Sequence, residues 1–224
     1  MAKTDLKPGK PPAKVLIVDD HPVVRDGLAA QLASVGDLEV CGEAEDVAGA
    51  LEQIRSARPD VAIIDISLKN GNGIDLIKRL RARNDPVRIL VWSMYPEDLY
   101  AERALRAGAQ GYVHKGRATR EILAALRAVL AGKVYLSGDQ ADRLLRRLVG
   151  GQAVERSPIE TLSDRELEAF ELMGRGLTTE AIAQKMRISP KTVETFRTRI
   201  KEKLGLNNIT ELIQRATRWV MENG

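Results

Sequence analysis

The fold is decided by one stretch near the start of the chain, Val15-Leu16-Ile17-Val18-Asp19-Asp20. Its first four residues form an apolar run, and three of them are β-branched. A run of this length is too short for a buried helix and is typical of a parallel strand that is covered on both faces. Similar apolar runs follow at 38–41, 61–64, 89–92 and 111–113. Amphipathic helical patterns lie between them, at 23–35, 47–56, 74–83, 98–107 and 119–131. Five strands alternating with five helices predict an α/β fold with a doubly wound, five-stranded parallel sheet.

The bulk composition indicates a globular protein of two small domains. The chain has 224 residues, of which 44% are apolar and 29% charged, and a single core seldom grows beyond about 100–150 residues. We find no apolar run near the roughly 20 residues that span a bilayer. Residues 1–13 are rich in Lys and Pro and lack the apolar segment of a secretory signal, so we expect a flexible tail.

The charge and the cysteine content are also informative. The formal net charge of +4 permits nucleic-acid binding without arguing for it. The single cysteine, Cys41, excludes an internal disulfide and fits a cytoplasmic protein. Because it lies in an apolar run, we expect Cys41 to be buried and inert.

The second half of the chain has a purely helical pattern. A helix is expected at 139–148, followed by a linker containing Gly150, Gly151 and Ser157-Pro158. Four further helices are expected at 164–173, 179–186, 190–204 and 210–221. The expected organisation is a tail at 1–13, an α/β domain at 14–131, a linker with a helix at 132–160, and an all-α domain at 161–224.

Three acidic residues follow predicted strands. Asp19 and Asp20 end the first strand and Asp65 ends the third. The carboxyl ends of parallel strands meet at one edge of the sheet, where ligands of such folds bind. Three carboxylates brought together there repel one another unless a cation neutralises them, and hard oxygen ligands on an open site favour Mg²⁺. Any one of these acids, taken alone, could equally well be a solvated loop residue or part of such a site.

Ser93 and Lys115 complete this group. They follow the fourth and fifth strands and place a hydroxyl and an ammonium at the same edge. Taken singly, they would be read as a loop serine and a surface lysine. A carboxylate nucleophile, a metal cluster, a hydroxyl and an ammonium together are what an aspartyl-phosphate site requires.

These residues stand in strings that resemble a response-regulator receiver domain with its flavodoxin-like sheet. The strings are Val18-Asp19-Asp20-His21-Pro22, Ile64-Asp65-Ile66-Ser67-Leu68, Ser93-Met94-Tyr95 and Gly108-Ala109-Gln110-Gly111-Tyr112-Val113-His114-Lys115. The resemblance implies that Asp65 accepts a phosphoryl group from a sensor histidine kinase. It also implies a Mg²⁺ site formed by Asp19, Asp20, Asp65 and the Ser67 carbonyl, and a switch formed by Ser93, Tyr112 and Lys115.

Two details of the receiver-like half need comment. Where relatives often have a proline, this chain has Lys69, which affects the stiffness of the loop rather than its chemistry. Gly71 and Gly73 keep that turn permissive. His21 is expected to start the first helix and to pack or cap locally rather than to act as a base.

The C-terminal helices carry clear boundary signals. Ser163 and Glu166 predict a capping box, and Thr178 or Thr179 is expected to cap the next helix. Ser189 and Pro190 open a third helix, so that two helices joined by a short turn form a helix-turn-helix. Five basic and two acidic residues give residues 190–204 a net charge of +3. A positive charge of this size more often belongs to the solvated face of a helix than to a DNA-binding surface. A DNA-binding surface would use such charges to contact the phosphates of the DNA backbone.

Here too the sequence resembles a known family, the LuxR-type effector domain, and the whole chain resembles NarL/FixJ response regulators. The strings are Leu162-Ser163-Asp164-Arg165-Glu166, Gly176-Leu177-Thr178-Thr179-Glu180-Ala181-Ile182-Ala183, Ile188-Ser189-Pro190-Lys191-Thr192-Val193-Glu194-Thr195 and Lys203-Leu204-Gly205-Leu206. The resemblance implies a four-helix domain whose third helix binds double-stranded DNA. Val193 would pack in the core. Residues facing base edges would be Glu194, Thr195 and Thr198, and residues contacting phosphates would be Lys191, Arg197, Arg199 and Lys201.

The expected function is a phosphorylation switch rather than an enzyme, with slow self-dephosphorylation at most. Phosphorylation would favour a homodimer or free a masked recognition helix. Three alternative functions would require other features. An Asp-nucleophile phosphohydrolase would usually need a second acid where Ser67 stands. A phosphorylation-independent DNA-binding regulator would not need the complete set of phosphorylation residues. A protein-interaction adaptor would not bind DNA.

Overall fold

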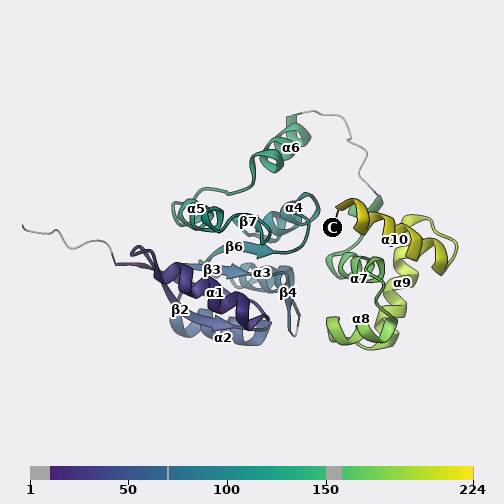
Figure 1. Cartoon of the computed structure of the whole chain (residues 1–224), viewed down its shortest axis with the longest axis horizontal. Coiled ribbons are helices and arrows are strands. Elements are labelled where there is room, and N and C mark those ends of the chain that lie inside the picture. Colours follow the sequence, from purple (N-terminus) through teal and green to yellow (C-terminus); the bar gives the residue numbers. More distant parts are fainter. Residues whose placement is uncertain (1–10, 70, 150–157, 224) are drawn as a thin grey trace, which may run out of the picture.

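The computed structural model describes residues 11–69, 71–149 and 158–223, and within them the N-terminal half forms a five-stranded parallel sheet (Figure 1). The strands are β1 (Ala13–Val18), β2 (Leu38–Ala44), β3 (Val61–Ile64), β6 (Arg88–Ser93) and β7 (Gly111–His114). Their order in the sheet is β2-β1-β3-β6-β7, and every pair is parallel. The predicted doubly wound, flavodoxin-like sheet is therefore confirmed.

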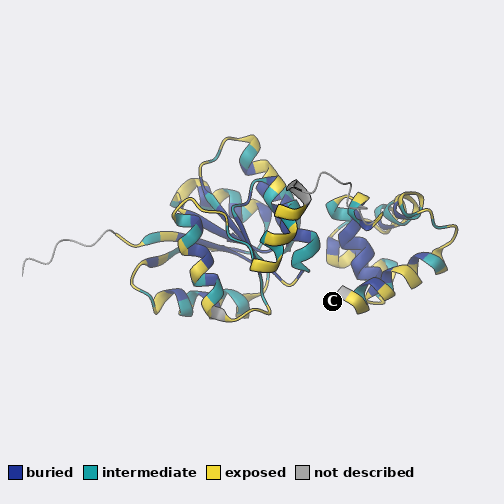
Figure 2. Ribbon diagram, turned by 90° about the horizontal axis from the view of Figure 1, so that it is seen from above, coloured by how far each residue is buried: buried dark blue, intermediate teal, exposed yellow. Residues whose placement is uncertain are grey.

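Helices cover both faces of this sheet. Alternate residues of a strand point to opposite faces, so Val15 and Ile17 of β1 pack with α1 (Pro22–Ala33) and α5 (Thr119–Leu130). Leu16 and Val18 pack on the other face, with α2 (Val47–Ala57), α3 (Gly73–Ala82) and α4 (Glu97–Ala107). Buried residues accordingly fill the strands and the inner sides of the helices, and a second buried group lies in the C-terminal helices (Figure 2).

A short hairpin that the sequence did not predict follows β3. Its strands are β4 (Ser67–Leu68) and β5 (Gly71–Asn72). Gly73 is required just after it, because a Cβ at this position would lie 2.1 Å from the Asp65 carbonyl oxygen. The hairpin therefore returns the chain tightly against the backbone of Asp65. Gly71 has a φ of 147°, which suits glycine.

The segment after α5 begins against the sheet and continues as a helix. Tyr135 forms a parallel bridge with Gly111 of β7, and α6 (Gly138–Val149), the expected linker helix, packs on α4. The 3-10 helix η1 (Pro158–Thr161) buries Ile159 in a core cluster shared with the C-terminal helices. The expected tail up to residue 10 and the linker at 150–157 lie outside the described residues.

The C-terminal unit consists of α7 (Asp164–Gly174), α8 (Thr179–Met186), α9 (Pro190–Leu204) and α10 (Ile209–Asn223). The expected capping box of Ser163 and Glu166 is present, Thr178 caps α8, and Ser189 caps α9 with proline at its first position. The core contains Val193, as expected, together with Phe170 and Trp219, whose rings lie 6.0 Å apart. Among the helices described, none is long and apolar enough to cross a membrane.

One expectation about a single residue needs correction, for Cys41, whereas His21 begins the first helix as expected. Cys41 is half-buried rather than buried, because β2 is an edge strand of the sheet. Burial still raises the pKa of its thiol, which fits an unreactive group. His21 occupies the N-cap position of α1, but its side chain makes no capping hydrogen bond. Its ring turns to the neighbouring acids, with Nδ1 2.8 Å from Asp20 Oδ1.

Candidate functional site

Three carboxylates meet at the carboxyl edge of the sheet. Parallel pairing of β1 with β3 brings Asp19, Asp20 and Asp65 together, and ligand atoms of these residues and of His21 all lie within 4.8 Å of one another. Asp19 and Asp65 are almost fully buried, with 2% and 4% of their surface exposed. Clustered carboxylate oxygens of this kind are the donor set that Mg²⁺ prefers, so the residues present fit the expected ion.

Lys115 and Ser93 reach the same carboxylates. Lys115 Nζ lies 2.5 Å from Asp19 Oδ2 and 2.6 Å from Asp65 Oδ2, and Ser93 Oγ donates to Asp65 Oδ1 at 2.6 Å. The pairing of β6 with β7 positions them, since the Lys115 backbone N–H donates to the Ser93 carbonyl. The structure thus brings together all five side chains that the sequence placed at this edge.

Burial and charge act against each other in this pocket. Burial raises the pKa of Asp65, and Lys115 and Ser93 counteract that shift. Burial alone would lower the pKa of Lys115, but the Asp65 and Asp19 carboxylates outweigh it and hold that pKa above its ordinary value. The ammonium therefore stays charged and neutralises part of the acidic cluster.

The remaining residues expected here lie close by. Tyr112 is fully buried and already points inward, where its hydroxyl donates to the Tyr95 carbonyl at 2.7 Å. Ser67 begins β4 and lines the same cavity as Asp65.

The second set of predicted site residues lies on α9. Those exposed on its surface are Lys191, Glu194, Thr195, Thr198 and Arg199, and Lys201 is half-buried. Arg197 differs, because only 17% of its side chain is exposed and Nη1 donates to Glu194 at 2.7 Å. Glu194 also accepts from the Thr179 hydroxyl of α8 at 3.1 Å. A contact from Arg197 to DNA would therefore require a side-chain rearrangement.

The structure adds an interface between the two halves that the sequence did not predict. Asp164 at the start of α7 pairs with Lys78 of α3 and Arg103 of α4, at 2.7 and 3.1 Å. Asn72 of β5 donates to the buried Glu168 carboxylate at 3.0 Å. The sequence contained one signal of this interface. Glu168 and Glu171 lie among the apolar residues of the helix predicted at 164–173, where a buried acid needs a partner.

This docking leaves the recognition helix open. The N-terminal half contacts α7, whereas the outward side chains of α9 remain exposed. Of the two alternatives left open by the sequence, this arrangement supports association of two chains rather than release of a masked helix. Any effect of phosphorylation on DNA binding would have to act through α7 or through association of two chains.

Glu171 is a second buried acid on α7. Its side chain is 2% exposed, and Oε1 accepts from Arg175 Nη2 at 2.5 Å. Burial raises the pKa of Glu171 to about 7, and Arg175 limits that rise. The carboxyl group is therefore close to half-protonated near neutral pH.

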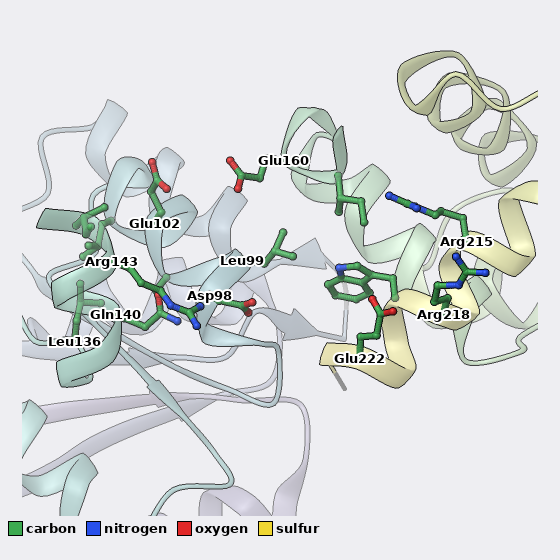
Figure 3. A pocket seen from close by; sticks show the side chains of 15 residues that line it. Asp98, Leu99, Glu102, Leu136, Gln140, Arg143, Glu160, Arg215, Arg218 and Glu222 are labelled. Carbon is green, nitrogen blue, oxygen red and sulfur yellow. The ribbon is translucent and has the colours of Figure 1, made fainter. Parts of the chain in front are cut away.

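Two cavities lie between the halves. One, of about 670 Å³, opens over Asp65 and is closed on its other side by α7 and Lys185 of α8. The other, of about 410 Å³, lies between α4 and α6 on one side and η1 and α10 on the other. Figure 3 shows Arg143 of α6 on one side of it and Arg218 and Glu222 of α10 on the other. Only the first cavity contains residues of the acidic pocket.

Comparison with known proteins gives matches to both halves. Residues 15–127 match the response regulator receiver domain, and residues 160–216 match the bacterial regulatory proteins of the luxR family. The chain is 39% identical over 204 residues to the DNA-binding transcriptional activator DevR/DosR of Mycobacterium tuberculosis, covering 91% of this chain and 94% of that protein. It is 34% identical over 205 residues to the response regulator GacA of Pseudomonas aeruginosa, covering 92% and 95%.

A similar arrangement is known from a solved structure. RcsB from Salmonella enterica serovar Typhimurium, bound to promoter rprA in the presence of phosphomimetic BeF3−, gives a TM-score of 0.64 at 28% identity. The match covers 92% of this chain and 98% of that one.

Proposed function

The chain belongs to the response regulators that join a receiver domain to a LuxR-family DNA-binding domain, and we propose that phosphorylation of Asp65 switches its activity. The chain is a two-component response regulator and a DNA-binding transcription regulator, and it acts as a phosphoryl acceptor rather than as an enzyme. The receiver domain is assigned to residues 14–131 and the DNA-binding domain to 161–224, joined by 132–160.

The proposed reaction is transfer of a phosphoryl group from a phosphohistidine of a sensor kinase to Asp65, in the cytoplasm. An Asp65 carboxylate oxygen attacks phosphorus as the nitrogen–phosphorus bond breaks, and the imidazole leaves with the bonding electron pair and takes up a proton. The observation that supports this role is the convergence of Lys115 and Ser93 on the two oxygens of Asp65. Both groups are placed to stabilise phosphoryl oxygens.

Asp19, Asp20, Asp65 and the Ser67 carbonyl would hold Mg²⁺, whose chemistry is to neutralise charge on the phosphoryl oxygens. Lys115 would pair with the phosphoryl group, and its present contacts to Asp19 and Asp65 hold it at the required place. Ser93 would donate its hydroxyl to a phosphoryl oxygen. Tyr112 would keep its inward position beside it.

The DNA-binding step is assigned to α9. Glu194, Thr195 and Thr198 would face base edges, with Glu194 able to accept from cytosine. Lys191, Arg199 and Lys201 would contact phosphates, and Arg197 would do so after leaving Glu194. RcsB has been solved bound to promoters and as dimers on DNA. By analogy, this chain would bind paired half-sites as a homodimer.

The experiment that tests this function is selection of bound fragments from genomic DNA, with and without acetyl phosphate and Mg²⁺. We expect specific fragments to be enriched by the wild-type chain when it is phosphorylated, and Asp65→Asn to show no response to acetyl phosphate. Equal enrichment under both conditions would favour a regulator independent of phosphorylation. Failure to retain DNA even at low salt would favour an adaptor.

A further inference from the structure

The cavity over Asp65 is built by both domains. On the receiver side it is lined by Asp65, Ser93, Lys115 and Arg117, among others. On the effector side it is lined by Glu171 and Arg175 of α7 and by Lys185 of α8. Its volume of about 670 Å³ is ample for a phosphoryl group. Two cations of the DNA-binding domain therefore line the same space as the proposed acceptor.

Arg175 is suited to reach into this space. It follows the last residue of α7, and its side chain is 44% exposed, whereas its partner Glu171 is 2% exposed. Its described contact to Glu171 uses Nη2, and a guanidinium carries five N–H donors in a planar fork that matches phosphate oxygens. The group can therefore turn toward an anion in the cavity at small cost in packing.

The charge of the pocket creates a need for another cation. Asp19, Asp20 and Asp65 carry three negative charges, which a divalent cation and Lys115 would balance. Phosphorylation converts the Asp65 carboxylate to an ester and adds about −1.5 to −2 charges. The phosphorylated pocket then carries up to about one uncompensated negative charge, in surroundings where burial makes such a charge costly.

We propose that Arg175, assisted by Lys185, binds the phosphoryl group on Asp65, so that the DNA-binding domain completes the phosphoryl pocket of the receiver. This inference rests on the proposed phosphorylation of Asp65. The guanidinium exchanges the Glu171 carboxylate for phosphoryl oxygens, and the docked arrangement of the two domains becomes more stable when Asp65 is phosphorylated.

Glu171 is the group that Arg175 releases. The charged and titratable groups around it are Arg175 and Glu168 of α7, Lys185 of α8, and Tyr95, Tyr100 and Tyr112 of the receiver. Its pKa is about 7 while Arg175 is still in contact. Once the guanidinium leaves, Glu171 takes up a proton, so the exchange leaves no unpaired charge buried on α7.

The first test measures binding of BeF3−, a mimic of the phosphoryl group, to the full chain with Mg²⁺, by the fluorescence of Trp92, which lies beside Lys115. Loss of a charge-assisted contact predicts about tenfold weaker binding for Arg175→Gln. Arg175→Lys keeps the charge but loses the planar fork, so its affinity should lie between those of wild type and Arg175→Gln. Lys185→Gln should lose about twofold to threefold. Arg55→Gln on α2, which does not line this cavity, is the charge-matched control and should bind like wild type.

The second test uses a substitution that should strengthen the binding of BeF3− instead of weakening it. Glu171→Gln removes the carboxylate that competes for Arg175, so binding of BeF3− should become about threefold to fivefold tighter. A merely structural role for the Glu171–Arg175 pair predicts weaker or equal binding in both variants. The ¹⁹F resonances of bound BeF3− should also shift in Arg175→Gln relative to wild type.

The results separate this inference from the proposed function. If wild type binds BeF3− but Arg175→Gln and Lys185→Gln bind it equally well with unchanged ¹⁹F resonances, the effector domain does not contact the phosphoryl group and the inference is wrong. If wild type binds no BeF3− and takes no label from acetyl phosphate, the proposed function itself fails.

Discussion

The acidic pocket of the receiver and the recognition helix α9 are organised in opposite ways. In the pocket, buried groups far apart in sequence hold one another: Lys115 contacts Asp19 across 96 positions and Asp65 across 50. On α9, exposed groups contact near neighbours, as Glu194 does with Arg197. Long-range contacts therefore fix the geometry of the pocket, whereas local contacts leave the side chains of α9 free to rearrange in the proposed complex with DNA. Substitutions in the pocket should accordingly have large effects on the rate of phosphorylation. Substitutions on α9 should have smaller effects on DNA binding that differ from residue to residue.

The largest effect is expected for Lys115→Met. This change removes the ammonium that contacts both Asp19 and Asp65, so the rate of phosphorylation by acetyl phosphate should fall about 100-fold. The rate is measured by following incorporation of the label with time. The exposed Arg120→Gln on α5 serves as a control of equal charge change. A loss of less than about threefold would mean that Lys115 does not stabilise the transferring group.

The next effect concerns the support of the recognition helix. Val193 is fully buried, so Val193→Ala should lower the free energy of unfolding of the DNA-binding domain by about 2 kcal/mol. Chemical denaturation followed by circular dichroism measures this change. The exposed neighbour Thr195→Ala should stay within about 0.5 kcal/mol of wild type while altering the choice of DNA sequence. Equal destabilisation by both substitutions would contradict the assignment of an inner and an outer face to α9.

A smaller effect is expected from pH at the interface between the two regions. The folded-state pKa of Glu171, about 7, lies above its ordinary value of 4.5, so the folded chain binds the proton more tightly than the unfolded chain. This contribution to stability is complete below pH 4.5 and is lost as the pH rises through 7. Between pH 6 and 8 the folded chain should lose about 1 kcal/mol of stability, and the loss should appear around α7. Amide exchange of α7 measures this loss, and Glu171→Gln should remove most of the pH dependence; an unchanged dependence would assign it to another group.

The smallest effect is expected at the rim of the DNA-binding surface. Arg199 is exposed on α9, and Arg199→Gln should weaken binding to all DNA sequences alike. The slope of log affinity against log salt should fall by about one in magnitude. Fluorescence anisotropy at several salt concentrations measures the slope. A change in sequence preference at constant slope would place Arg199 at a base edge instead.

The same contrast explains how far the sequence could be read. The ends of parallel strands converge, so the positions of Asp19, Asp65, Ser93 and Lys115 relative to predicted strands sufficed to predict their meeting. The caps at Ser163 and Ser189 are local signals, and they placed the helix starts correctly.

Other features depend on tertiary contacts that no local pattern encodes. The hairpin after Asp65 consists of two strands of two residues, too short for any periodicity. Docking of α7 on the receiver depends on Asn72 meeting Glu168 across 96 positions. The partial burial of Arg197 follows from its contact with Glu194. A count of charges along the sequence does not distinguish Arg197 from its exposed neighbours.

Phosphorylation of Asp65 can be located chemically. The full chain is treated with acetyl phosphate and Mg²⁺, the acyl phosphate is reduced with borohydride, and the resulting homoserine is located by mass spectrometry. We expect homoserine at position 65 in the wild-type chain and none in Asp65→Asn. Homoserine at another aspartate of the pocket, or none in the wild-type chain, would contradict it.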